Sequence, residues 1–573
     1  MALRYACLLL CIVLSPAGLA AAPSEGHYSL DRIRLGQFEG ATRVVFDVSG
    51  ASSHQFTKLS SPPRVVLSMS RARNEADVSG LPLANTPISS IEISHSDAGD
   101  LELVLLLSRE VDYKTFTLPP NGDRGNRLVL DLYPHRSETT ALSSPAAVNG
   151  SHEPSRFAFS GTWEQAWAIE TDGGGSQKFE ARIEPRLDIS VMENTTVTAI
   201  GRLRLDTLDH LGPDEDKPDN YSSINGPFYN DAHAEISLRE LYLDTKWSDT
   251  YWRIGKQQVV WGQADGIKVL DVVNPQSFRE FILDDFDRSR IPLTMVNMQA
   301  PVGEDKTLQL LWIPDTTYHE LAEAGTPYYL SSLLLVPVAP EGITADVRNP
   351  DVPDDLIEDS DLGARLSGFV GGWDVTLNYL YHYQDYPVLY QSLNFTETKT
   401  IGVVSPEYER NHLSGGTLSN VFGDFTLRAE VAYSTDTFHV SSDIANQGIE
   451  DSAELASVFG LDWQLTDYDT LLSTQWFQSH LFNYESSIRR GENEQNMSFY
   501  VQRDFANEIW QINALTLYSI DNQDSLVQIK LKYLWRSNIE LWFGSDIFSG
   551  DRDGIYGQFR DVDRLLLGLE MGF

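Results

Sequence analysis

The sequence contains little cysteine, few basic residues for its acidic content, and no long apolar run beyond its N-terminal region. Its two cysteines, Cys7 and Cys11, lie near the start, which excludes a disulfide framework or a cysteine-based zinc site elsewhere. Acidic residues number 82 against 43 basic ones, a net charge of −39, so nucleic acid is not an expected partner. Because no later apolar run reaches about 18 residues, no membrane-spanning helix is expected.

Common catalytic motifs are also missing. The sequence has no G-x-S-x-G elbow, no H-E-x-x-H pair and no P-loop, and its 12 histidines are scattered singly. No predicted strand carries the Ser and His pair that a barrel phospholipase would need. We therefore predict no catalytic residue, no cofactor and no metal site, and a protein that is not an enzyme.

The N-terminal region is typical of a secretory signal peptide, predicted over residues 1–22. Arg4 precedes an apolar run at 8–14, and three alanines at 20–22 offer a cleavage site. The protein is therefore expected to be exported.

A linker is predicted at 136–156, where Ser, Ala and Pro are frequent and no apolar periodicity is present. It separates a domain at 23–135, with 11 basic and 14 acidic residues, from a region at 157–573 with 29 basic and 66 acidic residues. Such different charge predicts different surroundings for the two parts.

The domain at 23–135 contains a repeated pattern of short strands, expected at 43–48, 56–59 and 64–69 and again at 103–107, 115–118 and 127–132. Proline pairs at 62–63 and 119–120 stand at matching places in the two copies. Short strands with Pro and Gly turns predict two sheets packed as a β-sandwich.

These segments resemble the AMIN domain of cell-wall amidases and pilus secretins. The resemblance rests on T-R-V-V-F-D at 42–47, P-P-R-V-V at 62–66, and Y-K-T-F-T-L-P-P with R-L-V-L-D-L-Y-P at 113–134. The resemblance implies a periplasmic domain that binds peptidoglycan. The alternatives are a β-sandwich that binds no ligand and a domain that docks on a protein partner. We expect Arg43, Arg64 and Arg127 on the binding sheet, as donors to carboxylates.

The region at 157–573 alternates apolar and charged residues over unusually long stretches. At 178–191 the odd positions are apolar or proline, whereas the even positions begin Lys178, Glu180, Arg182, Glu184 and Arg186. Stretches of about ten residues or more have the length that a tilted strand needs to cross a bilayer. This pattern predicts a transmembrane β-barrel with charged side chains inside it.

Eighteen barrel strands can be placed, at 157–169, 178–191, 195–206, 234–247, 250–259, 292–301, 306–314, 361–370, 373–383, 411–420, 424–434, 452–464, 469–479, 495–504, 508–518, 524–535, 539–547 and 562–573. Several boundaries are weak, so sixteen strands is also considered. Short and long connections alternate, as they do in β-barrel proteins of the outer membrane of Gram-negative bacteria. The fold class is thus all-β, and lipid and lipopolysaccharide are expected neighbours. An even number places both barrel ends in the periplasm.

The sequence ends on an alternating apolar strand that closes with Phe573. This resembles the signal that the barrel-assembly machinery recognises, so that machinery is an expected partner.

One inserted loop, at 261–291, is too long and too apolar for a solvated turn. It resembles the signature of a bacterial barrel family of unknown function, W-G-x-A-D-G…D-V-x-N-P…R-E. The matching residues are Trp261, Gly262, Ala264, Asp265, Gly266, Asp271, Asn274, Pro275, Arg279 and Glu280. We expect the loop either to fold into the lumen as a constriction or to pack on the rim.

If the loop lies in the lumen, its Asp265, Asp271, Asn274, Arg279 and Glu280 should meet charged wall residues, chiefly Arg182, Arg186, Arg202 and Arg204. Opposite charges on neighbouring strands also stabilise a sheet. The sequence therefore predicts a peptidoglycan-anchored outer-membrane channel or export porin. The alternative is a plugged barrel that acts as a structural tether between outer membrane and cell wall.

Overall fold

The computed structural model divides the chain into two compact units, residues 1–138 and 139–573. It describes residues 29–38, 41–49, 54–60, 63–69, 72–76, 78, 86–95, 101–107, 111–118, 126–134, 156–192, 194–208, 211, 220–303, 306–337, 343–395, 399–465, 468–506, 509–536 and 538–573. The predicted signal peptide and all of the predicted linker but its last residue lie outside the described residues.

The first unit contains two antiparallel sheets with one additional short parallel pairing. One has the order β5-β1-β2-β9-β8 and the other β3-β4-β7-β6. Their bounds are β1 (Ser29–Phe38), β2 (Ala41–Val48), β3 (His54–Ser60), β4 (Pro63–Met69), β5 (Arg73–Asn74), β6 (Ile88–His95), β7 (Leu101–Leu107), β8 (Val111–Leu118) and β9 (Asn126–Pro134). Both sheets contribute to one apolar core, for example through Phe46 and Leu103. The unit is therefore a β-sandwich with its own core.

The two sequence repeats interleave in this sandwich, so each sheet takes strands from both copies. Strand β2 pairs with β9, whereas β4 pairs with β7. Arg43 and Arg127 therefore lie on neighbouring strands, and Arg64 lies in the opposite sheet. The prediction that all three arginines share one sheet is wrong, because equivalent strands of the two repeats enter different sheets. The side chain of Arg127 is outside the described part.

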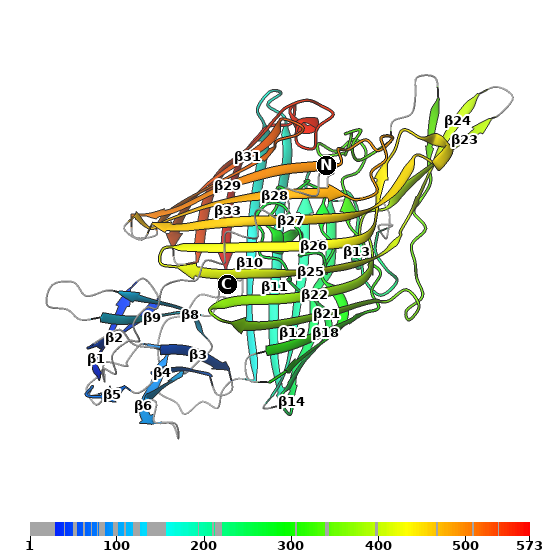
Figure 1. The fold of residues 1–573 in the computed structure, drawn as a ribbon. Helices are drawn as coiled ribbons and strands as arrows, with labels where there is room; N and C mark the ends of the chain where they lie inside the picture. The colour runs from blue at the N-terminus through cyan, green and yellow to red at the C-terminus, as the bar shows by residue number, and fades with distance from the viewer. Residues whose placement is uncertain are drawn as a thin grey trace, which may run out of the picture. The chain divides into compact units, whose positions relative to one another are not determined.

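The second unit is a closed antiparallel barrel of eighteen long strands among the described residues (Figure 1). They are β10 (Phe157–Glu170), β11 (Ser176–Met192), β12 (Thr195–Asp206), β14 (Ala234–Trp247), β15 (Thr250–Gln257), β17 (Leu293–Pro301), β18 (Lys306–Ile313), β21 (Asp361–Val370), β22 (Trp373–Tyr383), β25 (Arg410–Phe422), β26 (Phe425–Val440), β27 (Ile449–Leu465), β28 (Thr470–Leu481), β29 (Asn493–Phe505), β30 (Trp510–Ser519), β31 (Asp524–Arg536), β32 (Ile539–Ser549) and β33 (Arg564–Gly572). The all-β class and the count of eighteen are confirmed.

Much of the barrel is inverted relative to a soluble domain, with apolar side chains on its outer face and charged ones on its inner face, and buried apolar clusters lie inside it where the long connections pack. On β11, Phe179 is 43% exposed, whereas its neighbour Glu180 is 3% exposed. Exposed and buried residues also alternate along other long strands such as β22 and β32, as a sheet with one lipid face and one lumen face requires. Among the described residues, no helix has the length and apolar character to cross a membrane.

Short turns connect neighbouring strands at one rim of the barrel, and long connections do so at the other rim. At the turn between β21 and β22, Gly371 and Gly372 have φ of 61° and 92°, which glycine adopts without strain. The long connections carry minor elements: β13 (Tyr229–Asn230), β16 (Ser277–Phe278), α1 (Phe286–Ser289), β19 (Glu320–Leu321), β20 (Thr344–Val347), β23 (Val388–Phe395), β24 (Thr400–Glu407), η1 (Ile444–Asn446) and η3 (Gly557–Phe559). One of them, between β15 and β17, enters the barrel.

Candidate functional site: a loop held inside the barrel

The connection between β15 and β17, residues 258–292, is called the lumen loop. Its contacts are with the charged inner faces of strands on several sides of the barrel. The side chain of Asn274 joins its two ends. It accepts from the Val259 N–H at 2.7 Å and donates to the carbonyls of Gln257 at 3.3 Å and Ile291 at 3.0 Å. Asn274 therefore fixes the base from which the loop extends.

The first arm of the lumen loop, residues 258–273, is anchored to β18, β26 and β28. Trp261 is 1% exposed and its Nε1 donates to Gln309 at 2.9 Å. Asp265 accepts from Arg428 at 2.6 Å and Gln475 at 2.7 Å. Trp261 and Asp265, which both belong to the family-like signature, therefore bind the loop to the barrel wall.

Asp271 has a different role, because its partners belong to the lumen loop itself. Its Oδ2 accepts from Lys268 at 2.7 Å and from Arg290 at 2.7 Å. Arg290 lies just after α1 and also pairs with Asp287. Asp271 thus ties the first arm of the loop to the second.

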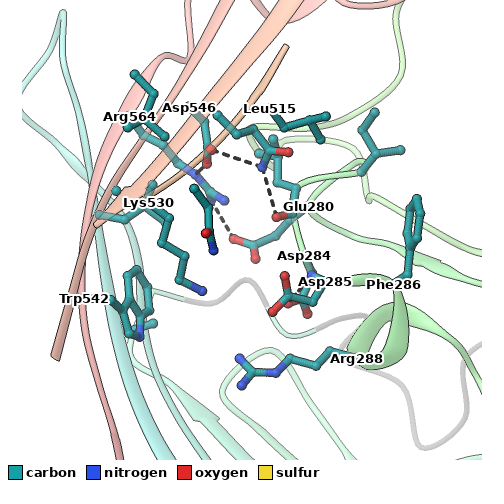
Figure 2. Close-up of a pocket in the computed structure, with 18 of the residues that line it drawn as sticks. Glu280, Asp284, Asp285, Phe286, Arg288, Leu515, Lys530, Trp542, Asp546 and Arg564 are labelled. Atoms are coloured by element: carbon teal, nitrogen blue, oxygen red, sulfur yellow. Dashed lines mark hydrogen bonds and ion pairs between the residues drawn. The ribbon is translucent and has the colours of Figure 1, made fainter. Parts of the chain in front are cut away.

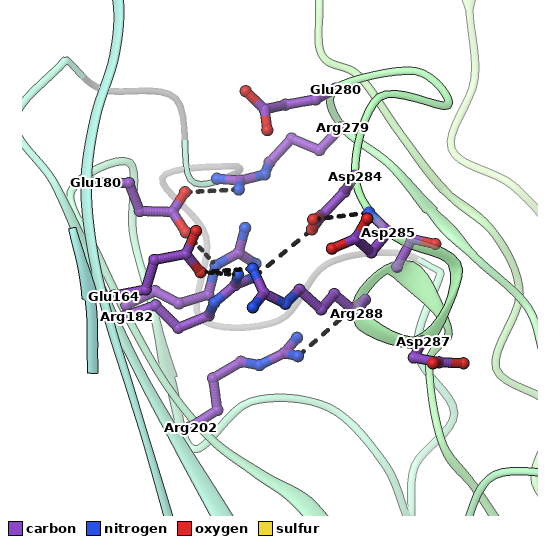
Figure 3. A network of polar contacts seen from close by, with 12 residues as sticks. Glu164, Glu180, Arg182, Arg202, Arg279, Glu280, Asp284, Asp285, Asp287 and Arg288 are labelled. Atoms are coloured by element: carbon purple, nitrogen blue, oxygen red, sulfur yellow. Dashed lines mark hydrogen bonds and ion pairs between the residues drawn. The ribbon is translucent and has the colours of Figure 1, made fainter. Parts of the chain in front are cut away.

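The second arm of the lumen loop, residues 275–292, meets the wall of β10 and β11 (Figure 3) and also that of β33. Arg279 donates to Glu180 at 2.8 Å. Glu280 accepts from Lys178 at 2.7 Å and Arg564 at 2.8 Å. Arg288 reaches Glu164 at 2.7 Å and Glu570 at 2.5 Å. The charged side chains of the loop therefore neutralise those of the wall, because each cation at the contact lies beside an anion of the other part.

Two of the four predicted wall arginines, Arg182 and Arg202, contact the lumen loop, and Arg204 shares its partner Glu180 with Arg279 of the loop. Arg182 pairs with Glu164 and lies 3.5 Å from Asp284 of the loop. The others bind mainly the wall: Arg202 pairs with Glu184 at 2.6 Å and Arg204 with Glu235 at 2.8 Å, while Arg186 pairs with Asp188 at 2.7 Å. Arg202 also donates to the Arg288 carbonyl at 3.5 Å. No contact between Arg186 and the lumen loop is recorded within the described residues.

Glu280 is ionised although the protein surrounds it. Burial alone would raise the pKa of its carboxyl, but the neighbouring cations Lys178 and Arg564 outweigh that effect and hold the pKa at about 2. The loop is therefore held by a charge that persists through the neutral pH range.

Space remains beside the second arm of the lumen loop. A cavity of about 390 Å³ lies between this arm and the strands β10, β11 and β29 to β33 (Figure 2). Charged residues line it together with apolar ones such as Leu515, Leu517 and Trp542. A cavity of this size suits a small solute.

Several residues that hold the loop were not among the predicted site residues. They are Glu164, Lys178, Glu430, Arg428, Gln475 and Arg564. Their positions on the charged faces of alternating strands are visible in the sequence. Their pairing with a loop up to 284 residues away has no local sequence signal.

Metal binding finds no support within the described ranges, where no cluster of three or more His, Cys, Asp or Glu side chains could hold an ion.

Comparison with known families agrees with both sequence resemblances. Residues 32–132 match the AMIN domain, and residues 212–497 match the family described as a protein of unknown function (DUF1302). The chain thus joins an AMIN domain to a barrel whose middle part, residues 212–497, matches DUF1302. The lumen loop lies entirely within the DUF1302 match.

A curated relative matches the AMIN part. The chain is 31% identical over 126 residues to N-acetylmuramoyl-L-alanine amidase AmiC of Neisseria meningitidis serogroup B, covering 21% of this chain and 30% of AmiC. It therefore spans less than a third of that relative.

Solved structures resemble the barrel at low identity. OccK5 (OpdH) of Pseudomonas aeruginosa is 12% identical, with a TM-score of 0.40, over 73% of this chain and 98% of that one. OccAB3 of Acinetobacter baumannii is 10% identical, with a TM-score of 0.41, over 73% and 99%.

Proposed function

We propose that this chain is a peptidoglycan-anchored outer-membrane channel whose solutes pass the lumen loop through the cavity beside its second arm. The observation that carries the proposal is the cavity itself. The loop leaves about 390 Å³ open beside β10, β11 and β29 to β33, while its ion pairs hold it to charged residues of β10, β11 and β33. A narrowed but unfilled lumen is the arrangement that selects among small solutes.

The AMIN domain supports the anchoring half of the proposal. We infer that it binds the cell wall in the periplasm and holds the barrel near it.

A second candidate function is a closed barrel that serves only as a tether between membrane and wall. The density of ion pairs favours it, since Arg279, Glu280 and Arg288 all bind the wall. A loop fixed at that many points could close the lumen for structural reasons alone.

Single-channel recording of the full chain in planar bilayers separates the two candidates. The channel gives discrete conductance steps, and Leu515→Trp, which adds a larger ring to the cavity lining, should lower their size by half or more. The matched control is Leu531→Trp on the neighbouring strand, where Leu531 lines an outward-facing groove. A wild-type protein without conductance would favour the tether.

A further inference from the structure

The cavity beside the lumen loop has two charged groups of opposite sign that the ion-pair network does not use. Within the described part of the chain, Lys530 and Asp285 make no ion pair. The ammonium of Lys530 lies 4.6 Å from the centre of the Trp542 ring. The Asp285 side chain makes no capping hydrogen bond to α1 and is exposed.

These two groups face each other from opposite sides of the cavity. Figure 2 shows Lys530 pointing inward from the strand wall, and Asp284 and Asp285 on the loop side. The positive charge of Lys530 is also the main reason that the pKa of Asp285 lies below its ordinary value. No ion pair joins them in the described part of the chain, and both line the same cavity of about 390 Å³.

The other charges that line the cavity are already compensated. Glu164 binds Arg182 and Arg288, and Glu280 binds Lys178 and Arg564. A ligand that displaced one of these partners would leave a buried charge unpaired, which is costly. Lys530 and Asp285 are therefore the groups available for recognition.

Apolar side chains occupy the cavity lining beside these charges. The loop contributes Ile282, Leu283 and Phe286, and the wall contributes Leu515, Leu517 and Trp542. Water in contact with such a surface is released when an apolar group replaces it. The lining therefore favours a ligand with an apolar body.

We propose that this cavity binds a small zwitterion with an apolar body, such as a hydrophobic α-amino acid, with its carboxylate at Lys530 and its ammonium at Asp285. The inference deepens the proposed function by naming the solute class, and it rests on that function only where passage is concerned. A ligand with a single charge would satisfy one group and leave the other with water alone. The zwitterion satisfies both, and its dipole lies along the field between them.

Three probes of similar shape test the proposal: L-phenylalanine, 3-phenylpropanoate and 2-phenylethylamine. They share a phenyl ring on a short chain and differ in carrying both charges, only the negative one or only the positive one. Binding to the purified full chain in detergent is measured by calorimetry. L-Phenylalanine should bind about tenfold or more tightly than either analogue, since a second charge contact of ordinary strength gives a factor of that size.

Single substitutions assign each charge to its contact. Lys530→Met should abolish the advantage of L-phenylalanine over 2-phenylethylamine, and Asp285→Asn should abolish its advantage over 3-phenylpropanoate. The control is Lys532→Met on the same strand, because Lys532 pairs with Glu540 at 3.4 Å and does not line the cavity. The control should retain the wild-type preference for L-phenylalanine over both analogues.

The outcomes separate this site from the channel. Equal binding of the three probes, or Lys530→Met and Asp285→Asn variants that retain the wild-type preference, would overturn the zwitterion site even if the protein conducts. Zwitterion-selective binding in detergent by a protein that shows no conductance would uphold the site and reject the channel.

Discussion

Glu280 is the residue at which the lumen loop and the barrel wall depend most on each other. Its carboxylate accepts from Lys178 of β11 and from Arg564 of β33. Taking such charges out of water is expensive, and the cost is recovered only when every charge has a well-placed partner. The network therefore fixes where the loop lies more than it adds to the stability of the barrel.

The depressed pKa of Glu280 makes the position of the loop sensitive to acid. The carboxyl has a pKa of about 2 in the structure and 4.5 when free. Its contribution, of the order of 3 kcal/mol, is therefore complete above pH 4.5 and is lost as the pH falls toward 2. We expect single-channel current fluctuations to increase below pH 4.5 in wild-type protein. Glu280→Gln should fluctuate already at pH 7, and a wild-type current that is steady down to pH 2.5 would contradict this role.

At the scale of elements, the long strands could be predicted because alternation along a strand is a local property of the sequence. The predicted ranges 234–247, 361–370 and 373–383 coincide with β14, β21 and β22. Short strands in the connections were missed, among them β20, β23 and β24, which form a sheet outside the barrel. Their pairing depends on where long loops meet in space, which no local pattern records.

The candidate site was predicted in part for the same reason. The signature indicated which loop residues would be used, including Asn274 and Glu280, and alternation indicated which wall residues face inward. The sequence left open whether the loop enters the lumen. Contacts such as Arg288 with Glu570 join segments far apart in the chain, so they follow only from barrel closure. The cavity could not be predicted because it is the space that remains after packing.

The closing seam between β10 and β33 depends on Phe573. Gly161 and Phe573 exchange backbone hydrogen bonds of 2.9 Å in both directions. A Cβ on Gly161 would lie 2.5 Å from the Phe573 ring, so the ring lies over the space that glycine leaves. Phe159 packs beside it at 6.0 Å between ring centres.

Phe573→Asp should therefore impair assembly, because it replaces the ring at the seam with a charge on the lipid face. We expect protease-sensitive protein in the periplasm and loss of the heat-modifiable barrel on gels. The matched control is Phe395→Asp on β23, an exposed aromatic outside the barrel sheet. A normal level of heat-modifiable Phe573→Asp barrel in the outer membrane would show that the seam closes without this residue.

At the scale of the whole molecule, the two units have separate cores and very different charge. The barrel region carries 66 acidic against 29 basic residues, whereas residues 23–135 carry 14 against 11. A nearly neutral domain meets little repulsion at an anionic wall. Since the AMIN domain has its own core, it should also fold without the barrel.

The isolated AMIN domain, residues 23–138, should co-sediment with purified sacculi. The barrel without this domain should still insert into the membrane but should separate from the wall more easily in detergent. Because the repeats interleave, the outer faces of the two sheets can be tested separately. Arg43 shares a sheet with Arg127, so Arg43→Ala should lower the bound fraction several-fold, whereas Arg64→Ala on the opposite sheet should change it little. A domain that stays in the supernatant at every sacculus and salt concentration would instead indicate that it docks on a protein, and the barrel would then reach the wall only through that partner.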